Sequence, residues 1–304
     1  DWSGFLILTV ALASMQLMLD RGNRLDWFDS TEIVIEACFF VGFLYLFVIH
    51  ILTARQPFLD PRIFLNRNLS IALLLTTLHG VILVGLTGLL PPFLQNLMGI
   101  PVLTVGLFMA PRGVTTAITA TLSGRLLSRF DPRPVILVGM SLLALSMWML
   151  ARFTPETSTL YFIIVVAIQG AGFGMFFVPV NTIAFGTLPA HYRGDATAFM
   201  SLQRKIGSSV GVSILVGQFL RQSQTNHAVL SQNVNPFSET LRHQPLPDQW
   251  SMSNVPGLAA LDREIVRQSE FMAYLHDFEW LALFIVILMP LVLFMQDPRR
   301  HQGN

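Results

Sequence analysis

Apolar runs of bilayer length dominate the chain. A helix needs about 20 mostly apolar residues to cross the hydrocarbon core of a membrane. Eight stretches meet this condition, with charged or turn-forming residues between them. They are residues 4–19, 33–52, 70–90, 102–122, 135–150, 160–185, 198–220 and 278–295. The pattern predicts an all-α membrane protein with eight transmembrane helices. The seventh run has the weakest signal, because Gln203, Arg204 and Lys205 lie in its first half.

Composition agrees with this class and excludes others. Hydrophobic residues make up 53% of the chain and charged residues 12%, about half the charged fraction of soluble domains. The net charge of +1 gives no basic field for nucleic acid. The single cysteine, Cys38, and seven histidines without ligand spacing predict no metal site. No nucleophile elbow or phosphate-binding glycine loop is present, so we expect neither an enzyme nor a bound cofactor. The start at Asp1, inside an apolar run, suggests a truncated sequence rather than a signal peptide.

Basic residues alternate between the connections. Eleven of the 19 Lys and Arg lie after the second, fourth and sixth spans or in the C-terminal tail, with Arg204 and Lys205 counted at the inner end of span seven. The positive-inside rule therefore puts these residues, and both ends of the sequence, in the cytoplasm. The protein is expected in the inner (plasma) membrane.

One connection, residues 221–277, is long and is expected on the outer side. Its first half, 226–256, is rich in Asn, Gln, Ser and Pro and predicts irregular structure. Its second half, 258–275, has helical spacing with one apolar stripe. That stripe would either dock a partner protein or pack on the protein's own bundle or on lipid headgroups. The stripe consists of Leu258, Leu261, Ile265, Val266 and Phe271.

Arg112 is the sharpest candidate for a functional residue. It lies in the middle of the fourth span, where an arginine costs about 2.5–3.5 kcal/mol and must face protein or a wet cavity. It either contacts substrate or a carboxylate in a central cavity, or binds carbonyls freed by Pro111.

His79 is the only titratable group that the sequence places near the middle of the last six spans, which carry no Asp or Glu in their apolar cores. It is either a proton relay or a histidine that packs between helices and bonds to a neighbour. A carrier driven by protons needs a group near the membrane midplane that titrates. In both cases, a carboxylate with this role is expected in protein outside this sequence.

Small and polar residues mark further positions in spans six and seven. Close helix packing is predicted at two GxxxG pairs, Gly170 with Gly174 and Gly207 with Gly211. Gln169 and Asn181 are polar at membrane depth, and Asn181 follows Pro179, which interrupts its helix. Interrupted helices often carry the binding sites of transporters, so both polar residues are candidates for the cavity.

The basic connection 124–133 is a candidate gating loop that would dock on neighbouring helices through Arg–Asp pairs. An equal alternative is a loop that only retains positive charge inside. Its charged residues are Arg125, Arg129, Asp131 and Arg133.

Four segments together resemble the EmrB/QacA-type drug:proton antiporters, fourteen-span members of the major facilitator superfamily. Residues 19–28 resemble the outer loop after the first extra helix of that family, and residues 59–67 resemble the approach to its C-terminal bundle. Residues 124–133 resemble the second copy of its gating loop, with Ser128 where the fuller motif has Asp. The segment from Arg193 to Gly207 resembles the start of its penultimate span.

The resemblance implies two inserted linker helices in residues 1–58 and the six-helix C-terminal bundle in residues 59–304. It implies export of amphipathic drugs or other hydrophobic small molecules by alternating access, driven by the proton gradient. The implied partners are the lipid bilayer, a periplasmic adaptor protein and an outer-membrane channel. Export of a specific metabolite, siderophore or fatty acid on the same fold, and a scaffold or receptor that transports nothing, stay open as alternatives.

Overall fold

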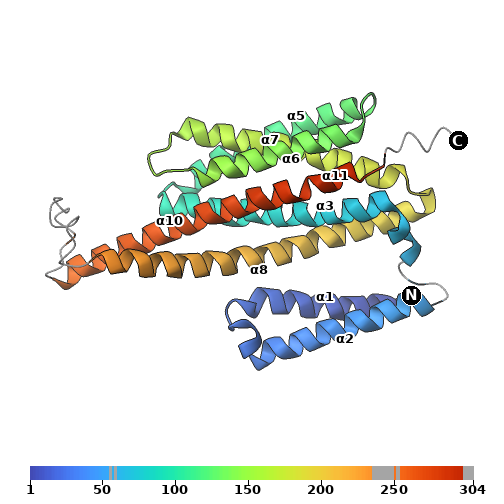
Figure 1. Cartoon of the computed structure of the whole chain (residues 1–304), viewed down its shortest axis with the longest axis horizontal. Helices are drawn as coiled ribbons and strands as arrows, with labels where there is room; N and C mark the ends of the chain where they lie inside the picture. Colours follow the sequence, from blue (N-terminus) through green and yellow to red (C-terminus); the bar gives the residue numbers. More distant parts are fainter. Residues whose placement is uncertain (55–56, 58–59, 235–249, 251–253, 297–304) are drawn as a thin grey trace.

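The computed structural model describes the whole chain except residues 55–56, 58–59, 235–249, 251–253 and 297–304, and the described part is all-α (Figure 1). Its long helices are α1 (Trp2–Gly22), α2 (Thr31–Thr53), α3 (Arg67–Val84), α5 (Val102–Leu127), α6 (Pro132–Ala151), α7 (Thr159–Gly186), α8 (Arg193–Asn233) and α10 (Val255–Leu288). Short helical pieces are η1 (Trp27–Asp29), η2 (Pro61–Leu65), η3 (Gly85–Leu89), α4 (Leu90–Pro92), η4 (Phe93–Leu97), η5 (Ala190–Tyr192) and α11 (Pro290–Leu293).

Seven of the described helical runs are long and apolar enough to cross a membrane, which makes the chain a multi-pass membrane protein. The eighth expected span lies in α8, which is too polar to qualify because it contains Asp195, Arg204 and Lys205. This helix nevertheless packs lengthwise against α3 and α10, both of which qualify (Figure 1). Arg204 and Asp195 are half-buried in this packing while Lys205 stays exposed, and the bundle keeps the eight long helices that the sequence predicts.

The expected loop 221–277 is largely a helical hairpin, so the prediction of irregular structure for 226–256 was wrong at its start. Helix α8 continues to Asn233, and at 41 residues it is about 62 Å long, twice the hydrocarbon thickness. Helix α10 begins at Val255 and runs unbroken into its membrane segment. The two extensions lie side by side beyond the bundle (Figure 1), where Asn226 Nδ2 donates to the Ser269 carbonyl at 3.3 Å. The central part of the loop lies outside the described residues.

Three of the five residues in the apolar stripe of this hairpin face inward. Leu261 and Phe271 are buried, and Ile265 is half-buried, so they pack within the protein rather than await a partner. Leu258 and Val266 remain on the exposed side. The sequence left two alternatives open for the stripe, docking of a partner and packing on the protein itself or on lipid headgroups. Packing on the protein itself accounts for the buried residues.

Proline reshapes the outer part of the third run. Pro91 and Pro92 have no N–H to donate to the preceding turn, and the helix widens there into two π-helical turns, η3 and η4. The second of these turns begins at Phe93, whose ring lies 5.5 Å from Phe271, 5.4 Å from Tyr274 and 6.1 Å from Phe278 in α10. This aromatic cluster fixes the widened segment to α10.

Glycines set the two closest helix crossings. A Cβ on Gly174 of α7 would lie 2.6 Å from the Ala120 nitrogen and 2.7 Å from the Thr116 carbonyl of α5, and one on Gly170 would meet the Arg112 backbone. In the other crossing, a Cβ on Gly207 of α8 would lie 2.9 Å from the Thr77 Cα of α3. Both backbone pairs touch because no side chain separates them. Gly211 likewise lies against Val81 of α3.

Polar side chains tie the bundle together where α3 begins. Asn66 Nδ2 donates to the Thr187 carbonyl at 3.1 Å, and Asn68 Nδ2 donates to the Gln296 carbonyl at 2.8 Å. Tyr192 Oη donates to Asp60 Oδ2 at 2.8 Å. The Arg62 backbone N–H and this tyrosine hold the pKa of the Asp60 carboxyl below its usual range. The connections before α3 and after α7 are thereby joined.

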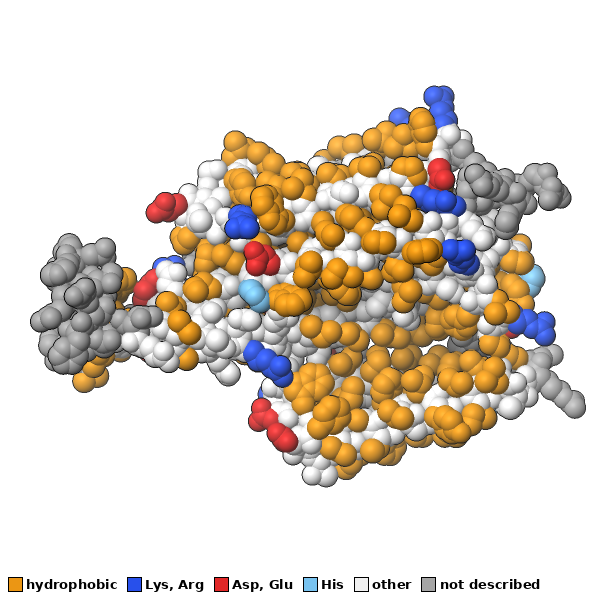
Figure 2. Space-filling model, viewed as in Figure 1, with side chains coloured by type: hydrophobic (Ala, Val, Ile, Leu, Met, Phe, Trp, Pro, Cys, Tyr) orange, Lys and Arg blue, Asp and Glu red, His pale blue; other side chains and the backbone are white. Residues whose placement is uncertain are grey.

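Helices α1 and α2 form a separate antiparallel pair beside α8 (Figure 1). An ion pair between Arg21 and Glu32 and a contact of 2.9 Å between His50 Nε2 and Asp1 Oδ2 close its two ends. Towards the bundle, Asn23 Nδ2 donates to the Ser213 carbonyl at 2.8 Å. More than half of the residues in the pair are exposed, and most of the exposed ones are apolar (Figure 2), as expected for helices that meet lipid or further protein.

The crossing of α5 and α7 gives a test of the fold. Gly174→Ala should destabilise the protein by about 1–3 kcal/mol, because its methyl group would meet backbone atoms that cannot rotate away. Gly106→Ala in α5 is the matched control, since a Cβ there meets nothing within 4 Å. Thermal unfolding in detergent, followed by tryptophan fluorescence, measures both. Equal midpoints for the two variants would contradict the assigned crossing.

Candidate substrate cavity

A cavity of about 460 Å³ lies among α3, α5, α7 and α8. All four helices contribute to its lining, and the two glycine crossings bring them together. The lining residues are His79, Leu83, Arg112, Gly113, Thr116, Ala117, Ala120, Phe173, Gly174, Phe177, Val178 and Arg204.

Two arginines enter this cavity directly beside the glycine contacts. A Cβ on Gly170 would lie 2.8 Å from the Arg112 Cα, so α7 presses on the backbone that carries Arg112. A Cβ on Gly80 of α3 would strike the Arg204 carbonyl and would lie 2.7 Å from the Ser208 nitrogen. Thr116 Oγ1 strengthens the first crossing by donating to the Gly170 carbonyl at 2.9 Å. These close contacts therefore fix the backbone positions from which the Arg112 and Arg204 side chains extend.

The cavity is cationic and aromatic. Arg112 is half-buried, its Nη1 atom is buried without a hydrogen-bond partner, and no described residue pairs with its charge. Arg204 Cζ lies 5.4 Å from the centre of the Phe177 ring, a cation–π geometry. None of the residues that line the cavity is acidic. A buried guanidinium without an anion is costly, so this arrangement can bind a negatively charged group beside an apolar body.

His79 lies in the same cavity among phenylalanines. Its ring is 8% exposed and its centroid is 5.3 Å from Phe173, 5.9 Å from Phe176 and 5.2 Å from Phe177. No hydrogen bond joins the ring to a described residue. The structure thus brings His79 and Arg112 together, as two of the four predicted cavity residues.

The other two predicted cavity residues lie away from the lining. Gln169 in α7 is fully buried, and neither atom of its amide has a partner in the described part of the chain. Asn181 uses its amide within its own helix, donating to the Phe177 carbonyl at 2.7 Å. Neither side chain reaches the cavity, although each lies one helical turn from a phenylalanine that does.

The basic connection between α5 and α6 uses its acid locally. Asp131 Oδ1 accepts from the Arg133 backbone N–H at 2.9 Å and begins α6, and Asp131 Oδ2 lies 3.9 Å from Arg133 Nε. Arg125 and Arg129 border a surface pocket of about 370 Å³ with Phe130. The described ion pair therefore lies within the connection, and the gating role stays a prediction.

Two residues were missed by sequence reasoning. Arg204 was assigned to the inner end of a span by its charge, whereas it lines the cavity. Asp277 was assigned to the loop, yet it is fully buried in α10, with neither carboxylate oxygen bonded to a described residue. Asp277 lies one residue before the expected span 278–295, so the absence of acids from the apolar cores of the last six spans stays a prediction. The burial of Asp277 becomes visible only in the structure, where α10 continues through the expected start of the span at residue 278.

A family model described as Major Facilitator Superfamily matches residues 3–212. The chain is 28% identical over 302 residues to the multidrug export protein EmrB of Haemophilus influenzae, covering 98% of this chain and 59% of that protein. It is 26% identical to the fatty acid resistance protein FarB of Neisseria gonorrhoeae, covering 100% of this chain and 60% of that one.

The chain therefore spans about three fifths of the length of these relatives. Among solved structures, it resembles a bacterial homologue of the human lysosomal transporter Spinster in an inward-facing and occupied conformation. The TM-score is 0.56 at 17% identity, over 86% of this chain and 56% of that one, so this likeness bears on the fold alone.

The buried Asp277 carboxylate gives a test of its own. Asp277→Asn should raise the midpoint of thermal unfolding, because an amide costs less than a carboxylate to bury without a partner. The expected gain in the free energy of unfolding is about 1–3 kcal/mol. Glu156→Gln, at an exposed position between α6 and α7, is the control and should leave the midpoint unchanged. A lower midpoint for Asp277→Asn would show that the carboxylate has a stabilising partner.

Proposed function

Because the chain belongs to the major facilitator superfamily, we propose that it is the C-terminal part of a transporter that exports amphipathic compounds across the inner (plasma) membrane. The observation that carries the proposal is the cavity that holds Arg112, Arg204 and His79 against Phe173 and Phe177. Aromatic faces suit a varied apolar body, and the arginines orient a polar end. The name of the EmrB relative, a multidrug export protein, supports the direction of transport.

Alternating access is the proposed mechanism. Helices α3, α5, α7 and α8 present the cavity, and a second bundle outside this sequence would close it. Residues 59–304 would then form the C-terminal bundle, and residues 1–58, with α1 and α2, would link the two bundles. The loose polar docking of this pair on α8, through Asn23 and Ser213, supports a linking role.

Coupling to protons completes this proposal. The residues that line the cavity offer His79 as their only group that titrates near neutral pH. We propose that a carboxylate in the other bundle carries the proton and that His79 packs among the phenylalanines. His79→Gln would then retain drug–proton exchange.

One observation favours a second candidate within the same class, export of amphipathic carboxylates such as fatty acids. Arg112 and Arg204 face the cavity without an acidic residue in its lining. A carboxylate could accept from a guanidinium fork while its chain lies on Phe173 and Phe177. The name of the FarB relative, a fatty acid resistance protein, agrees with this chemistry.

A periplasmic adaptor protein, joined to an outer-membrane channel, is the proposed partner. The hairpin of α8 and α10 extends beyond the bundle and offers a grip (Figure 1). Since Leu261 and Phe271 are used inside the protein, docking would fall to the exposed side that carries Leu258 and Val266.

Cysteine labelling tests the proposed topology, in which both ends are cytoplasmic and the hairpin is outside. In a Cys38→Ser background, Ala228→Cys on the exposed side of α8 should react with a charged maleimide in intact cells. Ser128→Cys, between α5 and α6, should react only after permeabilisation. The opposite pattern would invert the topology.

Arg112 gives the direct test of the transport proposal. In the full-length protein, Arg112→Ala should lower efflux of an anionic amphipath about tenfold or more, because the cavity loses its unpaired cation. Arg112→Lys should restore part of it, since an ammonium lacks the planar fork. Arg263→Ala, on the exposed hairpin, is the control. Full efflux by Arg112→Ala at equal expression would refute the role.

A further inference from the structure

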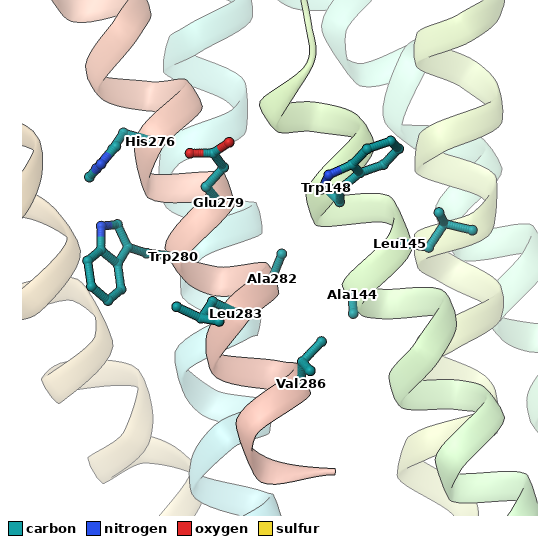
Figure 3. A pocket seen from close by; sticks show the side chains of 9 residues that line it. All are labelled: Ala144, Leu145, Trp148, His276, Glu279, Trp280, Ala282, Leu283 and Val286. Atoms are coloured by element: carbon teal, nitrogen blue, oxygen red, sulfur yellow. The ribbon is translucent and has the colours of Figure 1, made fainter.

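A groove of about 640 Å³ runs between α6 and α10 (Figure 3) and shares no lining residue with the substrate cavity. Ala144 of α6 and Ala282 of α10 are its small residues, and Leu145, Leu283 and Val286 line it beside them. The last three side chains are apolar, and Leu145 and Leu283 are more than two fifths exposed. An acyl chain matches this apolar lining in chemistry.

The polar end of the groove coincides with the end of a span. Helix α6 has 20 residues and is about 30 Å long, the thickness of the hydrocarbon core. Trp148 lies in its last turn and lines the groove with Trp280 of α10. Tryptophan is enriched at the level of lipid headgroups. The rim that these residues share with Glu279 therefore lies at the interface, whichever side of the membrane it faces.

Two opposite charges lie near this rim: Glu279 lines the groove, and Arg152 lies over Trp148, which lines it. On the α6 side, Arg152 is exposed, with its Cζ 5.5 Å from the Trp148 ring. On the α10 side, Glu279 is exposed, lines the groove, and makes no ion pair or hydrogen bond with a described residue (Figure 3). No ion pair joins Arg152 to Glu279, so each charge is available to a ligand.

We propose that this groove binds a phospholipid with a primary-amine headgroup, a phosphatidylethanolamine. The Arg152 guanidinium would hold the phosphate, and the Glu279 carboxylate would accept from the ammonium. One acyl chain would lie on Ala144 and Ala282. A choline headgroup has no N–H to donate to Glu279, and a glycerol headgroup has no cation. The charge pattern thus favours the ethanolamine lipid over both.

Native mass spectrometry of the full-length protein tests the proposal. The protein is released from nanodiscs of equimolar phosphatidylethanolamine, phosphatidylcholine and phosphatidylglycerol, and the retained lipids are counted. The ethanolamine lipid should be enriched. Glu279→Gln should lower that enrichment about tenfold, the loss of one charge-assisted hydrogen bond, without reducing total lipid. Glu270→Gln, on the same helix outside the groove, should retain it.

A second variant tests the groove itself. Ala282→Leu should reduce retention of all lipids, because the larger side chain fills the space for the acyl chain. Equal retention of the three headgroups by the unaltered protein would overturn the proposal, as would an unchanged enrichment in Glu279→Gln. A dimer that Ala282→Leu dissociates would also overturn it, since the groove would then seat a second copy of the chain.

Discussion

Direct contact between helix backbones is the constraint on which this structure depends. Gly170 and Gly174 let α7 touch α5, while Gly80 and Gly207 let α3 and α8 touch each other. In a membrane, lipid tails compete for apolar side chains, so tight packing of small residues becomes the main force that joins helices. The same contacts fix the backbone of Arg112 and of Arg204. Packing and cavity chemistry therefore have one origin.

The resulting cavity places two arginines beside two phenylalanines. Arg112 pays a desolvation cost without an anion, and Arg204 is partly compensated by the face of Phe177. Phe173 and Phe177 supply the apolar wall. Such a site can distinguish molecules by the charge at one end while accepting varied bodies at the other. The groove between α6 and α10 repeats this logic on the lipid side, with exposed charges in place of half-buried ones.

Much of the fold could be predicted from the sequence, because bilayer length imposes a strong pattern on apolar runs. The mid-span position of Arg112 and the spacing of the glycines also indicated their surroundings. The errors have physical causes. Arg204 was assigned to the inner end of its span because of its charge, and only the packing of its helix against α3 shows that it faces the cavity. Asn and Gln between 226 and 233 suggested a loop, but α10 supports a helix there. Asp277 lay at an expected span boundary, where an acid is ordinary, and its burial follows from the helix that continues past it.

The central claim is that two arginines on separate helices act on one anionic ligand. A double-mutant cycle on binding of laurate to the full-length protein in detergent tests it most directly, with dodecanol as the uncharged control. We predict that Arg112→Ala and Arg204→Ala each weaken laurate binding, that the double variant loses less binding free energy than the sum of the single losses, and that dodecanol binding hardly changes. Additive losses, or equal losses for laurate and dodecanol, would contradict it.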